Sequence, residues 1–513
     1  MFDKYKMKLV GISCVALLGV SLASCSEDTM DKINEDKNHA QNVQAKFIVT
    51  DLITASAFSI TGGDLSTYAS VYIEHEAGIH NQMYNAEMRV GEPKASSTYN
   101  NSWGSLYSTL KDAKKVVSKC SEGGEESYNS ITRGVGRFFI AYNLAILTDL
   151  FGDTPWSEAC DFQVSMQPKL DKQSEIYSEL ITMIDAAIED LSGTDKMPLG
   201  KNDLIYGGDA AKWTKACYAL KARVLMHGLY RASDQNAVLN QIIASVGKSF
   251  ANPTEELKFN HYDGVQNLNP YFAFGWSRDA LAASQSLVDK FTELKDPRLT
   301  QAFMTPGWVQ ITDPKEINAA PNGDVVQQQF VYSTSFVYGA GCAPTQMLSY
   351  HELMFLKAEA LARLNKNDDA KAALYSAMVA GFANLETACL SVFNTPVMAG
   401  VEGKFDLSAK VLDPYFNGEV TTRFTANPLK EIMIQKYLAF YGASGEAVEA
   451  YADYRRLVAL GDGDFIKLAN TKPFPQRYPY GSSDVVANLN VKEAYGDGEY
   501  VYTEKVWWAG GNR

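Results

Sequence analysis

One apolar stretch, from Gly134 to Trp156, constrains the fold of this chain more than any other part of its sequence. Its apolar residues recur at helical spacing and cover most of the helix surface: Phe138, Phe139, Ala141, Tyr142, Leu144 and Ala145. A helix that is apolar on most sides is buried among other helices. Gly152 suits a left-handed C-terminal cap, and Pro155 prevents the helix from continuing. Arg137 and Asp149 are polar groups on this apolar element, so we expect each to have a hydrogen-bonded partner.

Helical spacing returns along much of the remaining chain. It is found at 45–73, 99–113, 173–191, 213–227, 237–246, 353–364, 369–378 and 432–460. The pair 353–364 and 369–378 matches the small and apolar positions of a tetratricopeptide repeat but not its Trp, Gly and Pro positions. Together these patterns predict a mainly α protein in which divergent helix–turn–helix units stack side by side. Three irregular zones interrupt them, at 252–344 (apart from a helical pattern at 280–294), 400–427 and 471–513, and such long loops usually carry the binding residues.

The N-terminus has the pattern of a lipoprotein signal peptide at residues 1–24. Three lysines lie in the first eight residues, and the apolar run 9–23 is shorter than the roughly 20 residues that span a bilayer. The run ends in Leu-Ala-Ser-Cys, a lipobox that predicts cleavage before Cys25 and acylation of its sulfur. An ordinary signal peptide that happens to contain a cysteine is the alternative. Residues 25–41 are polar and predict a flexible acylated tether, followed by a folded domain at 42–513.

Charge and cysteine content exclude two further classes of protein. The net charge of −13 argues against a nucleic-acid partner, because phosphate binding requires a basic surface. Beyond Cys25, the mature chain has five cysteines, an odd number without a CxxC pair, so it is not a disulfide scaffold. They are Cys120, Cys160, Cys217, Cys342 and Cys389.

No motif in the sequence points to catalysis, a cofactor or a metal. The segment from Glu74 to His80 holds two histidines five residues apart, whereas a zincin needs four, and the second ring lies about 140° away around a helix. The glycines between Gly193 and Lys201 lack P-loop spacing, and Tyr441–Gly445 lacks the register of a nucleophile elbow. We therefore expect no enzyme activity. A surface hydrolase, the alternative, would need two carboxylates about 5–10 Å apart in a cleft.

Several motifs that follow one another in order resemble those of the SusD/RagB family, surface lipoproteins of Bacteroidetes that capture nutrients. They are Arg137–Tyr142 with Asp149–Pro155, Asp296–Leu299, Phe355–Ala360, Asp453–Arg456, and Pro475–Tyr480 with Asn488–Asn490. Lys505–Trp508 is similar to the ending of the second SusD-like subfamily, and Ser26–Asp28 resembles the acidic signal that exports such lipoproteins to the cell surface.

The resemblance implies a single helical domain with about four tetratricopeptide-like pairs, long irregular loops and minor β structure. It also implies a lipid-anchored position at the outer membrane, exposed at the cell surface. The implied ligand is a nutrient, an oligo- or polysaccharide above all. The implied partner is a SusC-like TonB-dependent transporter, over which the lipoprotein sits as a lid.

Aromatic residues in irregular segments are the candidates for ligand contact. Sugar rings stack on Trp and Tyr, and exposed rings need a reason to be exposed. We select residues after the first helix and in the zone 252–344: His80, Gln82, Tyr84, Tyr271, Phe272, Trp276, Arg278 and Trp308. The family's ligand contacts form no fixed motif that could locate them. Two alternatives stay open: an oligopeptide as the ligand, or a tetratricopeptide-like interaction module without a ligand of its own.

Overall fold

The computed structural model describes residues 43–442 and 444–513 of the chain. The predicted signal peptide, Cys25 and the tether up to residue 41 lie outside the described residues, and the predictions for them stay predictions. Residues Ala45–Arg513 form one compact unit, and the helices, strands and sites below belong to it.

Helix α7 (Ser130–Phe151) is the predicted apolar helix, and it packs against α3 (Ala45–Ala55), α6 (Asn100–Cys120), α8 (Gln173–Leu191) and α9 (Ala210–His227). It is long and apolar enough to cross a membrane, but 94% of its most apolar window is buried inside the protein. The prediction of a helix enclosed by other helices is therefore confirmed.

The polar residues of α7 have the partners that their position requires. Asp149 accepts a 2.9 Å hydrogen bond from His227 Nδ1, and Arg137 Nε donates a 2.8 Å bond to Asp190. Gly152 follows the helix with φ +79°, but its ψ of −133° is not that of a left-handed cap, so this detail of the prediction was wrong. A Cβ at Gly152 would collide with the guanidinium of Arg477, which explains the glycine.

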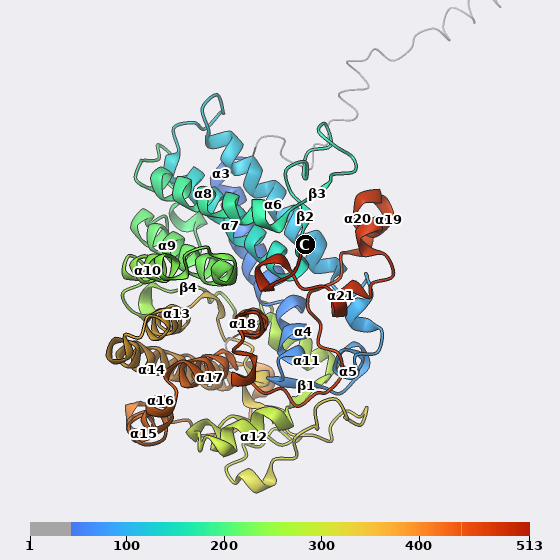
Figure 1. Cartoon of the computed structure of the whole chain (residues 1–513), viewed down its shortest axis with the longest axis vertical. Coiled ribbons are helices and arrows are strands. Elements are labelled where there is room, and N and C mark those ends of the chain that lie inside the picture. Colours follow the sequence, from blue (N-terminus) through green and yellow to red (C-terminus); the bar gives the residue numbers. More distant parts are fainter. Residues whose placement is uncertain (1–42, 443) are drawn as a thin grey trace, which may run out of the picture. The chain divides into compact units, whose positions relative to one another are not determined.

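Helices adjacent in the chain pack in pairs: α6 with α7, α8 with α9, α13 (Tyr350–Arg363) with α14 (Asn367–Ser391), and α17 (Pro428–Phe440) with α18 (Ala447–Leu460). Helix α10 (Gln235–Gly247) packs on both α9 and α13 and so joins the pairs into one stack. Figure 1 shows α8, α9 with α10, α13, and α14 with α17 following one another down one side of the unit. The prediction of a mainly α protein built from stacked helix pairs is confirmed.

Most predicted helix positions agree with the structure, but several bounds differ. The predicted helical stretch 45–73 is two α-helices, Ala45–Ala55 and Asp64–Tyr72, with a π-helical segment at Ser56–Thr61 between them, and α6 continues to Cys120 beyond the predicted residue 113. The carboxylate of Asp209 caps α9 by accepting from the backbone N–H groups of Ala211 and Lys212. The predicted helix at 432–460 is two helices, because the chain turns between them with Gly442 and Gly445 at positive φ. Helix α14 continues well beyond the predicted residue 378.

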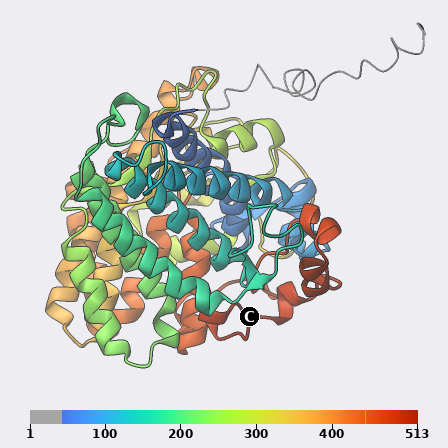
Figure 2. The same cartoon turned by 90° about the horizontal axis from the view of Figure 1, so that it is seen from above.

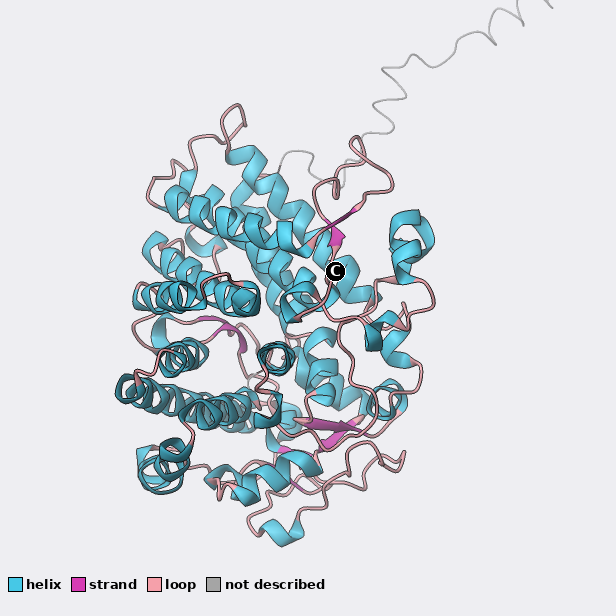
Figure 3. Ribbon diagram, viewed as in Figure 1, coloured by secondary structure: helices cyan, strands magenta, loops and turns pink. Residues whose placement is uncertain are grey.

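Strands are few and short, as Figure 3 shows. Four antiparallel pairs are present among the described residues: β1 (Glu76–Gly78) with β5 (Leu281–Ala283), β2 (Thr154–Pro155) with β3 (Leu170–Asp171), β4 (Leu257–Phe259) with β8 (Thr345–Leu348), and β6 (Phe303–Met304) with β7 (Thr334–Ser335). The zone 252–344 also contains α12 (Gln285–Glu293) and α11 (Pro270–Arg278), and α11 was not predicted.

The remaining helices are short, each of four to nine residues. They are α4 (Asp64–Tyr72), α5 (Asn81–Met88), α15 (Ala409–Tyr415), α16 (Thr421–Ala426), α19 (Ser482–Ala487), α20 (Leu489–Tyr495) and α21 (Tyr500–Thr503). The C-terminal segment returns to the N-terminal helices, because Trp103 Nε1 of α6 donates a 2.7 Å hydrogen bond to Asp484 of α19. Figure 2 shows this red segment beside the blue and cyan helices.

Candidate functional site

Helix α11 is fixed at both ends, and it carries the most exposed tryptophan of the irregular zone. The side chain of Asn269 caps its N-terminus, accepting from the backbone N–H groups of Tyr271 (2.9 Å) and Phe272 (3.3 Å). At the other end Asp279 adopts a left-handed conformation and its N–H donates to Gly275 O at 2.8 Å. A helix held in this way presents its outward side chains in defined positions.

The two faces of α11 differ in exposure. Phe272 is fully buried, and Gly275 lets the Tyr338 ring pack against the helix, since a Cβ there would collide with that ring. Trp276 lies one turn beyond Phe272 and is 49% exposed, with the two rings stacked at 5.9 Å and 22°. Phe272, selected as a ligand contact from the sequence, therefore supports Trp276 from below and has no surface to offer a ligand.

Trp308 approaches Trp276 from a turn that follows β6. Trp308 N–H donates to Thr305 O at 2.9 Å, and Thr305 N–H donates to Val309 O at 2.8 Å. Trp308 has φ +65°, a left-handed conformation that is rare for a bulky residue and costs on the order of 1–3 kcal/mol. Its ring centroid lies 6.0 Å from that of Trp276, at an interplanar angle of 50°. We call Trp276 and Trp308 the tryptophan pair.

The tryptophan pair forms one wall of a cleft of about 450 Å³. The other lining residues come from the turn after β6 and from the chain around the 3₁₀ turn Pro396–Met398: Gly307, Val309, Val397, Met398, Ala399, Gly400, Val401 and Glu402. This volume falls in the range of small-molecule sites. Glu402 is the only ionisable residue among the described residues that line it. We call this hollow the tryptophan cleft; it offers flat rings and apolar surface to a ligand.

One buried carboxylate, that of Glu76, is bonded to both segments that carry the tryptophan pair. Glu76 Oε1 accepts hydrogen bonds from Tyr271 OH (2.8 Å) on α11 and from Ser335 Oγ (2.6 Å) on β7. Burial raises the pKa of Glu76 to about 7, although both hydrogen bonds lower it. Because β7 pairs with β6, which leads to Trp308, Glu76 connects both segments that carry the tryptophan pair. Tyr271, also selected from the sequence, thus directs its hydroxyl inward.

The other selected residues lie around the C-terminal end of α11 and on α5. Burial raises the pKa of Asp279, and nearby His80 lowers it. Exposed Arg278 likewise opposes the effect of burial on the pKa of Asp64. Gln82 and Tyr84 on α5 are partly buried, and Tyr84 packs on a small apolar cluster. Trp276, Arg278, Trp308 and His80 therefore lie near the same end of α11, whereas Phe272 and the Tyr271 hydroxyl face the interior.

The acidic and histidine residues at 74–76 have structural partners. The Glu74 carboxylate accepts from the backbone N–H groups of Ala469 (2.8 Å) and Asn470 (2.7 Å). His75 Nε2 donates to Tyr437 O at 2.9 Å, and burial lowers the pKa of His75 to about 3. Within residues 43–442 and 444–513, no group of three or more His, Cys, Asp or Glu side chains is arranged to hold a metal ion.

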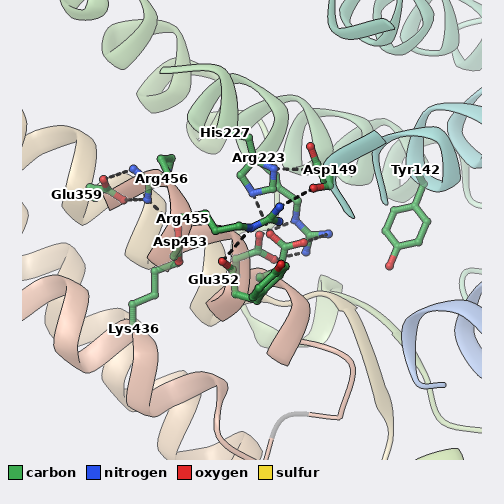
Figure 4. Close-up of polar contacts among 12 residues, drawn as sticks. Tyr142, Asp149, Arg223, His227, Glu352, Glu359, Lys436, Asp453, Arg455 and Arg456 are labelled. Carbon is green, nitrogen blue, oxygen red and sulfur yellow. Dashed lines mark hydrogen bonds and ion pairs between the residues drawn. The ribbon is translucent and has the colours of Figure 1, made fainter. Parts of the chain in front are cut away.

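A second set of polar residues lies between the helix pairs and is shown in Figure 4. His227 of α9 contacts Asp149 on one side and Glu449 of α18 on the other, at 2.9 and 3.0 Å. Arg223 pairs with Glu352 at 2.5 Å and with Glu449 at 3.2 Å. Burial lowers the pKa of His227, but the two carboxylates outweigh burial and raise it to about 9. These residues are buried and saturate one another, so the network joins α7, α9, α13 and α18.

Buried ion pairs between helices also explain two further motifs of the sequence. Arg456 forms ion pairs with Glu359 (2.5 Å) and Asp453 (2.7 Å), and Lys436 pairs with Asp453 at 2.7 Å. Each of these side chains is buried. The motifs Phe355–Ala360 and Asp453–Arg456 therefore supply ion pairs that hold α13, α17 and α18 together (Figure 4).

The sequence did not identify the second wall of the tryptophan cleft or an exposed ring at Phe330. Val397–Glu402 overlaps the start of the irregular zone 400–427, and its small and apolar residues carry no periodic signal. Phe330 lies among aromatic residues of which Tyr332, Phe336 and Tyr338 are buried, so its residue type alone does not distinguish it. The turn residues around each segment were the only available signal.

Comparison with known proteins gives a consistent result for most of the chain. A family model for SusD-like proteins, described as starch-binding and associating with the outer membrane, matches residues 41–481. Among curated proteins, none matches the chain.

Solved structures share the fold along nearly the full length. A SusD/RagB family protein from Bacteroides thetaiotaomicron is 44% identical with a TM-score of 0.87, covering 92% of this chain and 100% of that one. A chitin-binding SusD homolog from Flavobacterium johnsoniae is 15% identical with a TM-score of 0.66, covering 90% and 98%. A SusD homolog from Bacteroides fragilis is 19% identical with a TM-score of 0.66, covering 91% and 100%. At the two lower identities the likeness concerns the fold alone.

Proposed function

Because this chain belongs to the SusD-like family, described as starch-binding and associating with the outer membrane, we propose that it binds a glycan at the cell surface. In this proposal it is a lipoprotein anchored through Cys25, and it delivers the glycan unchanged to a SusC-like TonB-dependent transporter. The glycan binds in the tryptophan cleft.

The observation that carries this proposal is the tryptophan pair itself. Two indole rings 6.0 Å apart line one cleft, one of them 49% exposed and the other in a strained backbone conformation. Strain of this kind persists only where the surrounding structure enforces it, and it is concentrated at functional sites. Sugar rings present apolar C–H faces that stack on indoles. Because Glu402 is the only ionisable residue in the described part of the cleft lining, the cleft suits a neutral sugar.

The residues that line the tryptophan cleft also support the proposal that the glycan is delivered without being hydrolysed. Glycoside hydrolysis uses two carboxyl groups flanking the scissile bond, about 5–10 Å apart. The described lining of the tryptophan cleft provides one, Glu402. Anchoring through Cys25 is supported by the lipobox pattern, and transport by the family's association with the outer membrane.

Affinity electrophoresis and isothermal titration against a polysaccharide panel that includes starch and chitin test the proposal. We expect the wild-type protein to bind at least one glycan, and Trp276→Ala and Trp308→Ala each to weaken binding about tenfold or more. Phe162→Ala is the matched control, because Phe162 is 76% exposed on a different loop and does not line the cleft. Incubated glycan should keep its original length.

Each other outcome has a distinct meaning. Binding of oligopeptides without binding of any glycan would show that the ligand is a peptide and not a sugar. Binding that survives both tryptophan substitutions would remove the tryptophan cleft from the proposal. Capture of the transporter without any small ligand would favour an interaction module.

A further inference from the structure

We propose that Phe330 is a second stacking residue for the glycan, separate from the tryptophan cleft, so that several successive sugars of one glycan chain contact the protein. The sugar chain would extend from the tryptophan pair, across the C-terminal end of α11, to the loop 326–331. We call these six residues the Phe330 loop. This inference rests on the proposed function and adds to it a second contact residue.

Phe330 is among the most exposed aromatic residues of the described chain, at 68%. A single exposed apolar residue needs no special explanation. Phe330 differs because its backbone is strained as well, with φ +59°. A phenylalanine in the left-handed region is a steric outlier. Burial of the ring does not offset this backbone strain, because the ring faces solvent.

The end of α11 holds Phe330 in this conformation. Phe330 N–H donates a 3.1 Å hydrogen bond to the carboxylate of Asp279, and Gln329 Nε2 donates a 2.8 Å bond to Arg278 O. Asp279 is itself left-handed, with φ +41°, and is fixed to the helix by its N–H. Two successive residues of the Phe330 loop are thus bound to the two residues that end α11.

The base of the Phe330 loop is closed independently of α11. Val326 N–H donates to Tyr332 OH at 3.2 Å, and Asn318 Nδ2 donates to Val331 O at 2.9 Å. Tyr332 is buried in an apolar cluster with Ala77 and Ala282, on the strand pair β1–β5. The loop is therefore pre-organised, and a ligand that stacks on Phe330 does not have to order it first.

The position of the Phe330 loop relative to the tryptophan pair indicates the ligand. Trp276 and Asp279 are three residues apart, about 4.5 Å along the helix axis. The exposed Arg278 and the half-buried Asp279, to which the Phe330 loop is bound, and the half-buried His80 near Asp279 can exchange hydrogen bonds with hydroxyl groups. Two aromatic sites connected by the polar end of one helix match a chain of sugars, in which apolar faces and hydroxyls alternate.

Isothermal titration with oligosaccharides of two lengths tests the inference. The probes are a disaccharide and an oligomer of about seven sugars, from the maltooligosaccharides if starch binds and from the chitooligosaccharides if chitin binds. We expect Phe330→Ala to weaken binding of the long oligomer about three- to tenfold and to leave the disaccharide unchanged. Trp276→Ala should weaken both, and Phe330→Trp should restore the long oligomer.

Equal affinity of wild type and Phe330→Ala for the long oligomer overturns the inference and leaves the proposed function intact. So does an equal loss for both lengths, because Phe330 would then act on the tryptophan cleft and not as a separate contact. Failure of the wild-type protein to bind any glycan overturns the proposed function, and the inference with it. Phe162→Ala serves again as the control for removal of an exposed ring.

Discussion

The hydroxyl of Tyr271 donates a 2.8 Å hydrogen bond to the buried carboxylate of Glu76. Since Ser335 Oγ donates to the same oxygen at 2.6 Å, one carboxylate joins the helix of Trp276 to the strand pair that leads to Trp308. The relative position of the tryptophan pair therefore depends on Glu76, which lies 195 residues before Tyr271 in the chain.

Replacement of Glu76 by Gln should change the pH dependence of stability. Burial raises the pKa of Glu76 to about 7 from its ordinary value of 4.5. Between these two values the native protein holds a proton that the unfolded chain has released, so the Glu76 contribution to the free energy of unfolding falls as pH rises. Above about pH 7 we expect Glu76→Gln to be more stable than wild type by on the order of 2 kcal/mol, and near pH 4 to be equal to it.

Urea unfolding of both proteins at about pH 4, 6 and 8 measures this difference. Other groups titrate over the same range, His75 among them, but they are common to the two proteins and cancel in the comparison. A stability difference that stays constant with pH would show that Glu76 does not titrate in this window.

Replacement of Trp308 by Gly and by Ala should separate strain from ligand binding. Both changes remove the Trp308 ring and should weaken glycan binding at the tryptophan cleft to the same extent. Because Trp308 has φ +65°, Gly relieves the left-handed strain that Ala retains, so Trp308→Gly should be the more stable variant by roughly 1 kcal/mol. At Trp276, inside α11, the order should reverse, since Gly is about 1 kcal/mol worse than Ala in a helix. Urea midpoints of the four variants give both comparisons, and the same order at both positions would contradict the assignment of strain.

The helical scaffold could be predicted from the sequence because its signal is local. The period and continuity of apolar residues in α7 required burial, and burial required partners for Asp149 and Arg137. The identity of those partners could not be predicted: His227 lies 78 residues from Asp149. Periodicity gives the face of a helix that is buried but does not identify the residue against which it packs.

Helix α11 was not predicted from the sequence because aromatic residues occupy both of its faces. Asn269-Pro270 is a good start signal, but Tyr271, Phe272, Phe274 and Trp276 give no apolar period. Phe272 and Trp276 are one turn apart and chemically alike, and distant residues decide which is exposed. Tyr338 and Glu76 hold one side of the helix inside the protein, which leaves Trp276 at the surface. The choice of aromatic segments was thus predictable, and the orientation of each ring was not.

Replacement of Cys25 by Ala should release the protein from membranes. A lipobox cysteine is the site of acylation, and each buried methylene contributes about 0.8 kcal/mol to membrane binding. In cells that lack the transporter, we expect Cys25→Ala in the soluble fraction after sedimentation, and Cys160→Ala in the membrane fraction as wild type. The experiment uses cells without the transporter because binding to the transporter would otherwise keep the variant in the membrane fraction. A Cys25→Ala protein that still sediments with membranes would exclude lipid anchoring at this residue.

Replacement of His227 by Gln should destabilise the protein most at neutral and acidic pH. The carboxylates of Asp149 and Glu449 outweigh the effect of burial and raise the pKa of His227 to about 9, above its ordinary value of 6.5. The contribution of charged His227 to the free energy of unfolding is therefore complete below about pH 6.5 and is lost as pH rises through about 9. Breaking a buried ion pair costs about 3–5 kcal/mol. The free energies of unfolding of the two proteins, measured by thermal unfolding, should therefore differ by this amount at about pH 6 and converge near pH 10. Because His227 and Glu449 form a salt bridge between α9 and α18, a difference that does not shrink at high pH would mean that shape alone, and not charge, holds these helices together.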